Sequence, residues 1–163
     1  MPVNPRIDVS DALAGLAGLA QVRHRLARSM AVAGGSQIRD EAKARAPVES
    51  GALRDAVYLA YRDGRSTESQ VVYSVSWNKK KAPHGHLIEF GHWQTRVAYQ
   101  GSDGNWYSGA PLAAPRWVPA VPFLRPAYDA VLPRLANVMV ERARDRLPEL
   151  LRGLYTPDDD EFV

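Results

Sequence analysis

The sequence of 163 residues contains no cysteine. This absence excludes a disulfide scaffold, catalysis by a thiol and the common zinc fingers, because all three depend on cysteine sulfur. No stretch approaches the roughly 20 consecutive apolar residues that a membrane-spanning helix needs, and the start lacks the layout of a signal peptide. We therefore expect a globular protein with no membrane partner, in a composition compatible with a reducing cytoplasm.

Aromatic residues are absent from positions 1–57 and concentrated further along the chain. Twelve of the 14, including all four tryptophans, lie between Tyr58 and Tyr128. A core of this size does not require four buried tryptophans, and aromatic residues and arginine are enriched where proteins contact one another. We therefore expect contacts with other chains to use Trp77, Trp93, Tyr99, Trp106, Arg116 and Trp117.

Positive charge is unevenly distributed. Lysine and arginine number 21 against 18 acids, a net charge of +3, but four of the acids are clustered at positions 158–161. The chain before this cluster carries 21 cations against 14 acids, or +7. Lys79–Lys81 follows Trp77, a combination that can hold single-stranded nucleic acid, although a solvated turn is the simpler interpretation. Non-specific nucleic-acid binding is therefore the alternative function.

Two long helices are predicted, one toward each end of the chain. Apolar residues recur at steps of three and four between Asp8 and Pro47, where the proline ends the helix. The pair Gly34–Gly35 has low helix propensity, so we expect either two helices or one bent helix here. The second helix begins with Pro126 at its first position and continues to about residue 152, with kinks or turns at two internal prolines, Pro133 and Pro148.

Between the helices, residues 53–117 are rich in valine, tyrosine and tryptophan, as is typical of strands. The sequence Gly101–Gly104 predicts a hairpin turn, and prolines make residues 114–122 an extended, stiff segment. Three short apolar runs are candidate strands, of which the first two form an antiparallel pair: residues 52–61, 70–77 and 87–90.

These patterns predict an α+β fold, with a long N-terminal helix and a C-terminal helix packed on a small antiparallel sheet. We expect one domain over residues 1–156, with residues 93–118 inserted as a hairpin and proline-rich arm. The acidic residues 157–163 are expected to form a flexible tail.

Catalytic residues are not evident. The sequence has no nucleophile elbow and no phosphate-binding loop, so we predict no catalytic residue and no cofactor. His84, His86, Glu89 and His92 could hold a divalent metal, but alternation along a strand places Glu89 opposite the first two histidines. On a helix, Glu89 would lie three positions from both His86 and His92, a workable spacing, but Gly85 and Gly91 disfavour a long helix here. We therefore predict no metal site, and a metal-dependent hydrolase is the least favoured alternative.

Three segments, taken together, resemble one known family. Residues 42–54, AKARAPVESGALR, are similar to the "AKxxAPvxTGxLRxS" signature of the phage gp-ten-like morphogenesis family. Residues 86–92, HLIEFGH, resemble its "hLvEfGt", and residues 122–127, PFLRPA, resemble its "PFlrPA". His92 departs from the usual threonine, and residues 93–118 form a longer insertion than is typical. The blocks occur in the family's order across residues 42–127.

The resemblance implies a structural virion protein of the neck or tail-completion class of lambda-like long-tailed phages. Such proteins form a homo-oligomeric ring, expected to be hexameric, at the head–tail junction between head connector proteins and the tail terminator. DNA passes through the lumen without sequence-specific binding. The protein is thus expected in the virion, after synthesis in the host cytoplasm.

The matched positions also have structural roles that we expect from their chemistry. Pro47 ends a helix and Gly51 permits a tight turn. Arg54 could pair with Glu89, and loss of a buried pair would cost several kcal/mol. The remaining motif residues expected to support the fold are Leu53, His86, Phe90, Gly91, Pro122, Phe123, Arg125 and Pro126.

Overall fold

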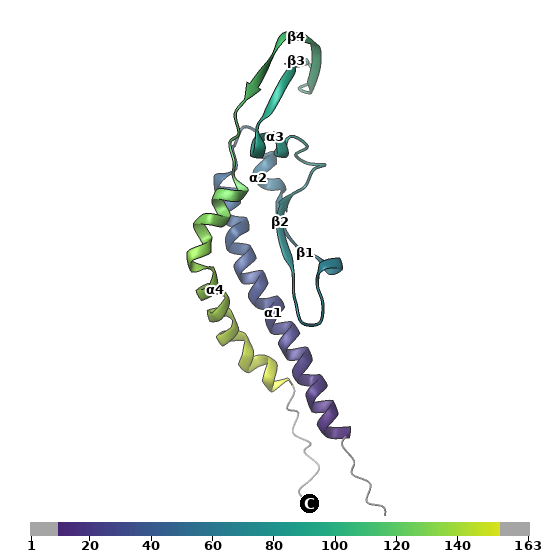
Figure 1. The fold of residues 1–163 in the computed structure, drawn as a ribbon, viewed down its shortest axis with the longest axis vertical. Coiled ribbons are helices and arrows are strands. Elements are labelled where there is room, and N and C mark those ends of the chain that lie inside the picture. The colour runs from purple at the N-terminus through teal and green to yellow at the C-terminus, as the bar shows by residue number, and fades with distance from the viewer. Residues whose placement is uncertain (1–9, 154–163) are drawn as a thin grey trace, which may run out of the picture. The chain divides into compact units, whose positions relative to one another are not determined.

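The computed structural model describes residues 10–153, and its elements are labelled in Figure 1. Along the chain they follow the order α1, α2, β1, η1, β2, α3, β3, β4 and α4. Within the described range β1 pairs with β2 and β3 pairs with β4, which gives two separate two-stranded antiparallel sheets. The fold is therefore α+β, as predicted, with its strands divided between two sheets.

Contacts divide the chain into two compact units. Of the described residues, the first unit holds 10–37, 59–74 and 132–153, and the second holds 38–58 and 75–131. A single domain over residues 1–156 stays a prediction. The acidic tail predicted at 157–163 lies outside the described residues.

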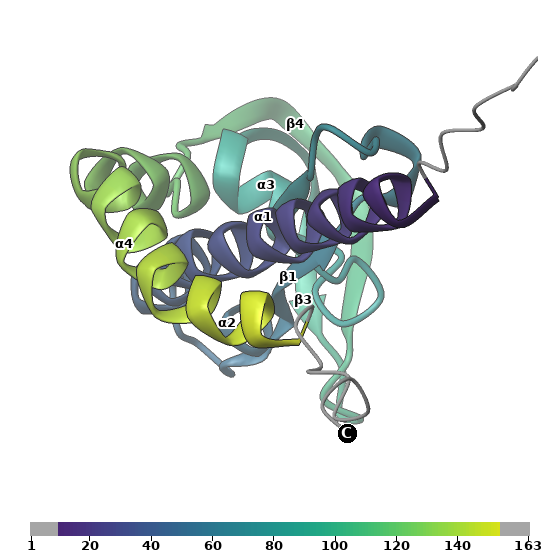
Figure 2. The same ribbon diagram turned by 90° about the horizontal axis from the view of Figure 1, so that it is seen from below.

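Helix α1 spans Ser10–Arg45 without a break, as Figure 2 shows, so of the two alternatives expected here the one with two helices is excluded. The reason lies in the packing of the first unit. A Cβ added to Gly34 would lie 2.8 Å from Leu135 Cδ1, and one added to Gly35 would lie 2.6 Å from Leu59 Cδ1. Because neighbouring side chains fill this space, their packing compensates for the low helix propensity of the two glycines.

The first unit contains half of the residues of the first sheet and the greater part of both long helices. Strands β1 (Val57–Tyr61) and β2 (Tyr73–Trp77) are joined by a loop that contains the 3-10 turn η1 (Asp63–Arg65). The Tyr61 and Tyr73 rings lie 5.3 Å apart between centroids. These contacts hold the paired strands beside one another, as the composition predicted.

The second unit has a small core that is built largely from alanine. Phe123 is fully buried within it and contacts the half-buried Trp77 edge to face, with 6.1 Å between ring centroids. Small side chains let the backbones approach closely, so a few large residues fill the remaining space. The buried residues of this core are Ala42, Ala46, Leu53, Ala56, Val57, Ala82, Phe123 and Ala127.

Two short helices stand where strands were expected. Helix α2 (Ala52–Ala56) occupies the first half of the run predicted as a strand, and it follows Gly51, whose φ is 80°. Helix α3 (Gly85–Phe90) occupies the run predicted as a third apolar strand. Gly85 fits here because an added Cβ would lie 2.4 Å from Trp77 Nε1. Both predictions were wrong because helices of one or two turns are too short to display their period.

Helix α4 spans Leu124–Arg152, so Pro126 is its third residue and not its first. The helix continues through Pro133 and Pro148. No helix in the described part of the chain is long and apolar enough to cross a membrane.

Candidate functional site

The second sheet is a long hairpin made by β3 (His92–Gln100) and β4 (Trp106–Val118), which we call the β3–β4 hairpin. It lies wholly within the second unit. At its base His92 pairs with Val118, and near its tip Gln100 pairs with Trp106. The predicted turn is confirmed, because the Gly101 N–H donates to the Asn105 carbonyl at 2.8 Å.

Asp103 organises this turn. Its carboxylate accepts hydrogen bonds from the Tyr107 hydroxyl, from the Asn105 side-chain amide at 2.9 Å and from the Asn105 backbone N–H at 3.0 Å. These donors stabilise the charged form and lower the pKa of Asp103 to about 2. The turn is therefore held by an ionised carboxylate at neutral pH.

Strand β4 is longer than β3, and the extra residues of β4 are accommodated by irregularities in the pairing. The register shifts between the pairs Gln94–Arg116 and Arg96–Pro111, and again before the pair Ala98–Ser108. Proline cannot donate a ladder hydrogen bond, so Pro111 and Pro115, which both lie in this part of β4, suit the irregular pairing. The proline-rich run predicted as extended thus forms part of a strand, up to Val118.

Exposed aromatic residues extend along the β3–β4 hairpin. Trp93 and Trp117 contact edge to face near the base, with centroids 5.5 Å apart, and Tyr99 stacks on Tyr107 near the tip at 5.8 Å. Trp93 and Trp106 are 63% and 64% exposed. A two-stranded hairpin is marginally stable alone, and an aromatic surface of this size is typical of a protein contact.

The structure gathers five of the six predicted interface residues on this hairpin. Trp93, Tyr99, Trp106, Arg116 and Trp117 all belong to β3 or β4, and Arg116 donates to the Gln94 side chain at 2.9 Å. Trp77 lies in β2 instead, half-buried in the core of the second unit. Tyr107 and Val97 are exposed on the same hairpin and were not predicted, although alternation along the strands could have indicated them.

The histidine cluster is separated by secondary structure. His84 precedes α3, His86 lies on it and His92 begins β3. Among residues 10–153 no three histidine or acidic side chains are placed so as to hold a metal ion. Lys79–Lys81 lies in an exposed turn after β2, where Asn78 Oδ1 accepts from the Lys80 N–H at 2.9 Å.

The hydrogen-bond partners of Glu89 were not predicted from the sequence. Its carboxylate is only 7% exposed and accepts hydrogen bonds from the backbone N–H groups of Phe123 at 2.8 Å, Leu124 at 3.0 Å and Arg125 at 3.2 Å. These are orphan donors at the start of α4. The expected pairing with Arg54 is wrong, because the Arg54 guanidinium lies 3.2 Å from Asp55.

The three motif segments meet in the second unit. Glu89 from the second segment binds the backbone of the third, and the Val121 N–H donates to the Ile88 carbonyl at 2.8 Å. Leu53 from the first segment and Phe123 from the third belong to one core. The exposed motif side chains Phe90 and His86 are not part of that core.

Comparison with known proteins gives one family match. Residues 11–91 match a family described as "Bacteriophage HK97-gp10, putative tail-component". No curated protein and no solved structure is similar enough to count as a match. The matched segment ends at Gly91, immediately before β3 begins, so the β3–β4 hairpin lies outside it.

Proposed function

We propose that this chain, which belongs through residues 11–91 to the HK97-gp10-like family of bacteriophage tail components, is a ring-forming subunit of the phage neck. The family gives the chain a structural role in the virion. The proposal adds a position, at the junction of head and tail, and an assembly, a closed homo-oligomer that we expect to be hexameric. Its neighbours would then be head connector proteins on one side and the tail terminator on the other.

The observation that carries this proposal is the uncovered aromatic surface of the β3–β4 hairpin. Trp93, Trp106 and Trp117 are exposed, and the side chains of the described residues leave them so. Burial of an aromatic residue against a partner contributes strongly to binding. The hairpin therefore supports a contact with a neighbouring copy.

A second uncovered surface lies on α1. Residues 14–20 carry no charge, Leu16 and Leu19 are 63% and 51% exposed, and a Cβ added to Gly15 would meet nothing within 4 Å. An uncharged apolar helix surface is unfavourable in water. Two different uncovered surfaces favour a heterologous contact, in which one surface of a subunit binds the other surface of its neighbour. Such contacts form a closed ring when the rotation between neighbouring subunits permits it.

The proposed ring has a lumen through which DNA passes. Recognition of bases is not required for passage, and a strongly basic lumen would retain DNA through its phosphates. We therefore place most arginine side chains at contacts between subunits and not along the lumen.

The proposal is tested by removing the outer part of the hairpin, which carries Tyr99, Trp106 and Tyr107. Residues 97–107 are replaced by Asn-Gly, which favours a two-residue turn, and the molar mass is measured by light scattering with negative-stain images. The wild-type chain should form rings, whereas the variant should be a folded monomer. A control variant carries serine at Lys79–Lys81, an exposed turn of the same unit, and should assemble normally.

Two results would contradict the proposal. A shortened chain that still forms rings shows that the outer part of the hairpin is not needed for the contact. A wild-type chain that stays monomeric at high concentration, both alone and with purified connector and terminator proteins, excludes ring formation.

A further inference from the structure

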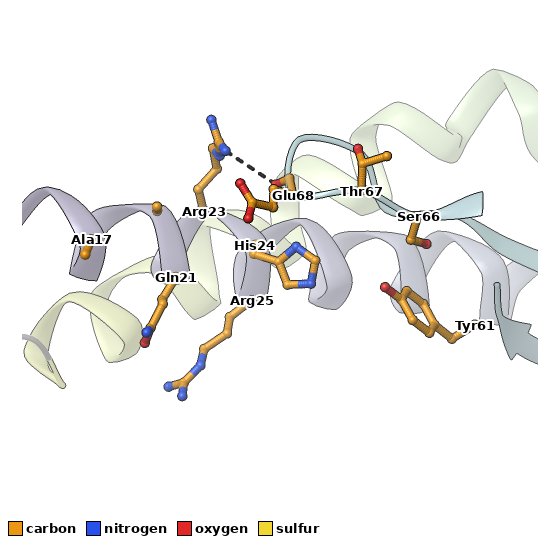
Figure 3. A pocket seen from close by; sticks show the side chains of 10 residues that line it. Ala17, Gln21, Arg23, His24, Arg25, Tyr61, Ser66, Thr67 and Glu68 are labelled. Carbon is orange, nitrogen blue, oxygen red and sulfur yellow. Dashed lines mark hydrogen bonds between the residues drawn. The ribbon is translucent and has the colours of Figure 1, made fainter. Parts of the chain in front are cut away.

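An open groove of about 750 Å³ lies in the first unit, between α1 and the loop that follows β1. Figure 3 shows Arg23, His24 and Arg25 on α1, where Arg23 points toward Glu68 and Arg25 points to the other side of the helix. The Arg23 guanidinium donates to the backbone carbonyl of Glu68 at 3.4 Å. The groove is therefore lined by two arginines and a histidine against one carboxylate.

The arginines of this groove have no ionic partner among residues 14–153, whose side chains the structure describes. The ion pairs formed there involve Arg39, Arg45, Arg54 and Arg146, and none includes Arg23 or Arg25. Guanidinium groups bind carboxylates in a bidentate manner with good geometry. The groove therefore has the chemistry to hold an acidic peptide.

The described chain ends beside this groove. Gly153 lines a smaller cavity of about 360 Å³ together with Gln21, Arg25 and Arg146, and both Gln21 and Arg25 also line the larger groove. Asp158 follows Gly153 by five residues, which span at most about 17 Å when extended. The acidic cluster at 158–161 is therefore tethered within reach of the groove.

We propose that residues Asp158–Glu161 of the same chain occupy the groove, where their carboxylates pair with Arg23 and Arg25. Four acids within four positions complement the excess positive charge of the lining. The tether gives them a high effective concentration, so binding within one chain is favoured over binding between chains. The tail would then shield α1 from other anions. This inference does not depend on ring formation.

Carbodiimide cross-linking tests the contact in the full-length chain, since it joins a lysine amine to a touching carboxylate with loss of water. The variant Arg25→Lys provides the amine in the groove, and Arg134→Lys provides an exposed amine on α4 that does not line it. Mass spectrometry of the monomer should detect a link from residue 25 to residues 158–161, and none from residue 134. High salt should abolish the link, because it screens the exposed charges.

Neutralising the tail provides the matched control. With Asp158, Asp159 and Asp160 changed to Asn and Glu161 to Gln, the link from residue 25 to the tail should be lost, while a link to Glu68 within the groove remains possible. The proposal is overturned if residue 25 gives no link to the tail, or if residue 134 gives an equal one. The proposal is also overturned if, in a mixture of isotope-labelled and unlabelled chains, residue 25 links only to the tail of another chain and never to the tail of its own chain.

Discussion

Glu89 connects two segments that are separated by more than 30 residues along the chain. Its buried carboxylate accepts from three consecutive backbone N–H groups at the start of α4. A negative charge at a helix N-terminus is favourable, and these donors would otherwise be unsatisfied in a partly buried site. Glu89 is therefore a capping residue that fixes where α4 begins.

Replacing this cap should destabilise the fold. We expect Glu89→Ala to lower the free energy of unfolding by about 3 kcal/mol, because hydrogen bonds to a charged group are worth about 1.5–3 kcal/mol and buried donors lose their partner. Urea denaturation followed by circular dichroism measures the change. The exposed acid Glu49, changed to alanine, is the control and should shift stability by less than about 0.5 kcal/mol. Equal stability of the two variants would remove the capping role.

Asp103 makes the hairpin turn sensitive to acid. Its pKa is lowered from 3.8 to about 2 by hydrogen bonds from Tyr107 and Asn105. A depressed pKa in the folded state means that the stabilisation is complete above the unfolded value of 3.8 and is lost as the pH falls through about 2.

We therefore expect the Asp103 carboxyl carbon to titrate in NMR spectra with a midpoint near pH 2. The stacking of Tyr99 on Tyr107, followed by near-ultraviolet circular dichroism, should weaken over the same range. Asp103→Asn should remove this acid transition while leaving the spectrum at pH 7 close to that of the wild type. A midpoint near 4 would contradict the hydrogen-bonded turn.

At the scale of the element, α1 contains two classes of glycine. Gly15 has open space where its Cβ would be, whereas Gly35 has Leu59 Cδ1 at 2.6 Å. Gly15→Ala should therefore stabilise the monomer by up to about 1 kcal/mol, since alanine has the higher helix propensity. Gly35→Ala should destabilise it by about 1–2 kcal/mol, because overpacking outweighs the propensity gain. Thermal unfolding followed at 222 nm measures both. Equal shifts of the same sign would show that propensity alone governs the helix.

The long elements could be predicted from sequence because their period repeats many times. The C-terminal ends of α1 and α4 agree with their predicted limits, and the turn at Gly101–Gly104 follows from its glycines. The short helices α2 and α3 could not be predicted, since five or six residues do not establish a period. The strand predicted over residues 52–61 therefore proved to be half helix.

The residue types of the candidate site could be predicted from the sequence, but the contacts that these residues make could not. The density of tryptophan and tyrosine indicated a contact surface, and the structure places three of the four tryptophans and two of the tyrosines on one hairpin. The assignment of Trp77 to the same surface ignored that a β-strand next to a core buries one of its faces. The partner of Glu89 depends on a tertiary contact, for which no local pattern exists.

At the scale of the whole molecule, the net charge of the chain determines whether it binds DNA or allows DNA to pass. Residues 10–153 carry 20 cationic and 13 acidic side chains, and the cluster at 158–161 reduces this excess. Affinity for DNA falls steeply with salt when many phosphates are contacted.

We expect the wild-type chain not to be retained on duplex DNA at about 0.15 M salt. The tail-neutralised variant, in which Asp158–Asp160 become Asn and Glu161 becomes Gln, should be retained more strongly, since four negative charges are removed. Elution from immobilised DNA in a salt gradient measures both. Wild-type retention beyond about 0.3 M salt would favour the nucleic-acid-binding alternative over passive passage.

The β3–β4 hairpin leaves and rejoins the rest of the chain at one place. His92 pairs with Val118, and a Cβ added to Gly91 would lie 2.8 Å from the Val118 carbonyl oxygen. The match to the family also ends at residue 91. The hairpin is therefore joined to the rest of the second unit at one place, so it can be exchanged as one segment between related chains. On the proposed function, such an exchange would change which neighbour the protein contacts and leave the rest of the second unit unaltered.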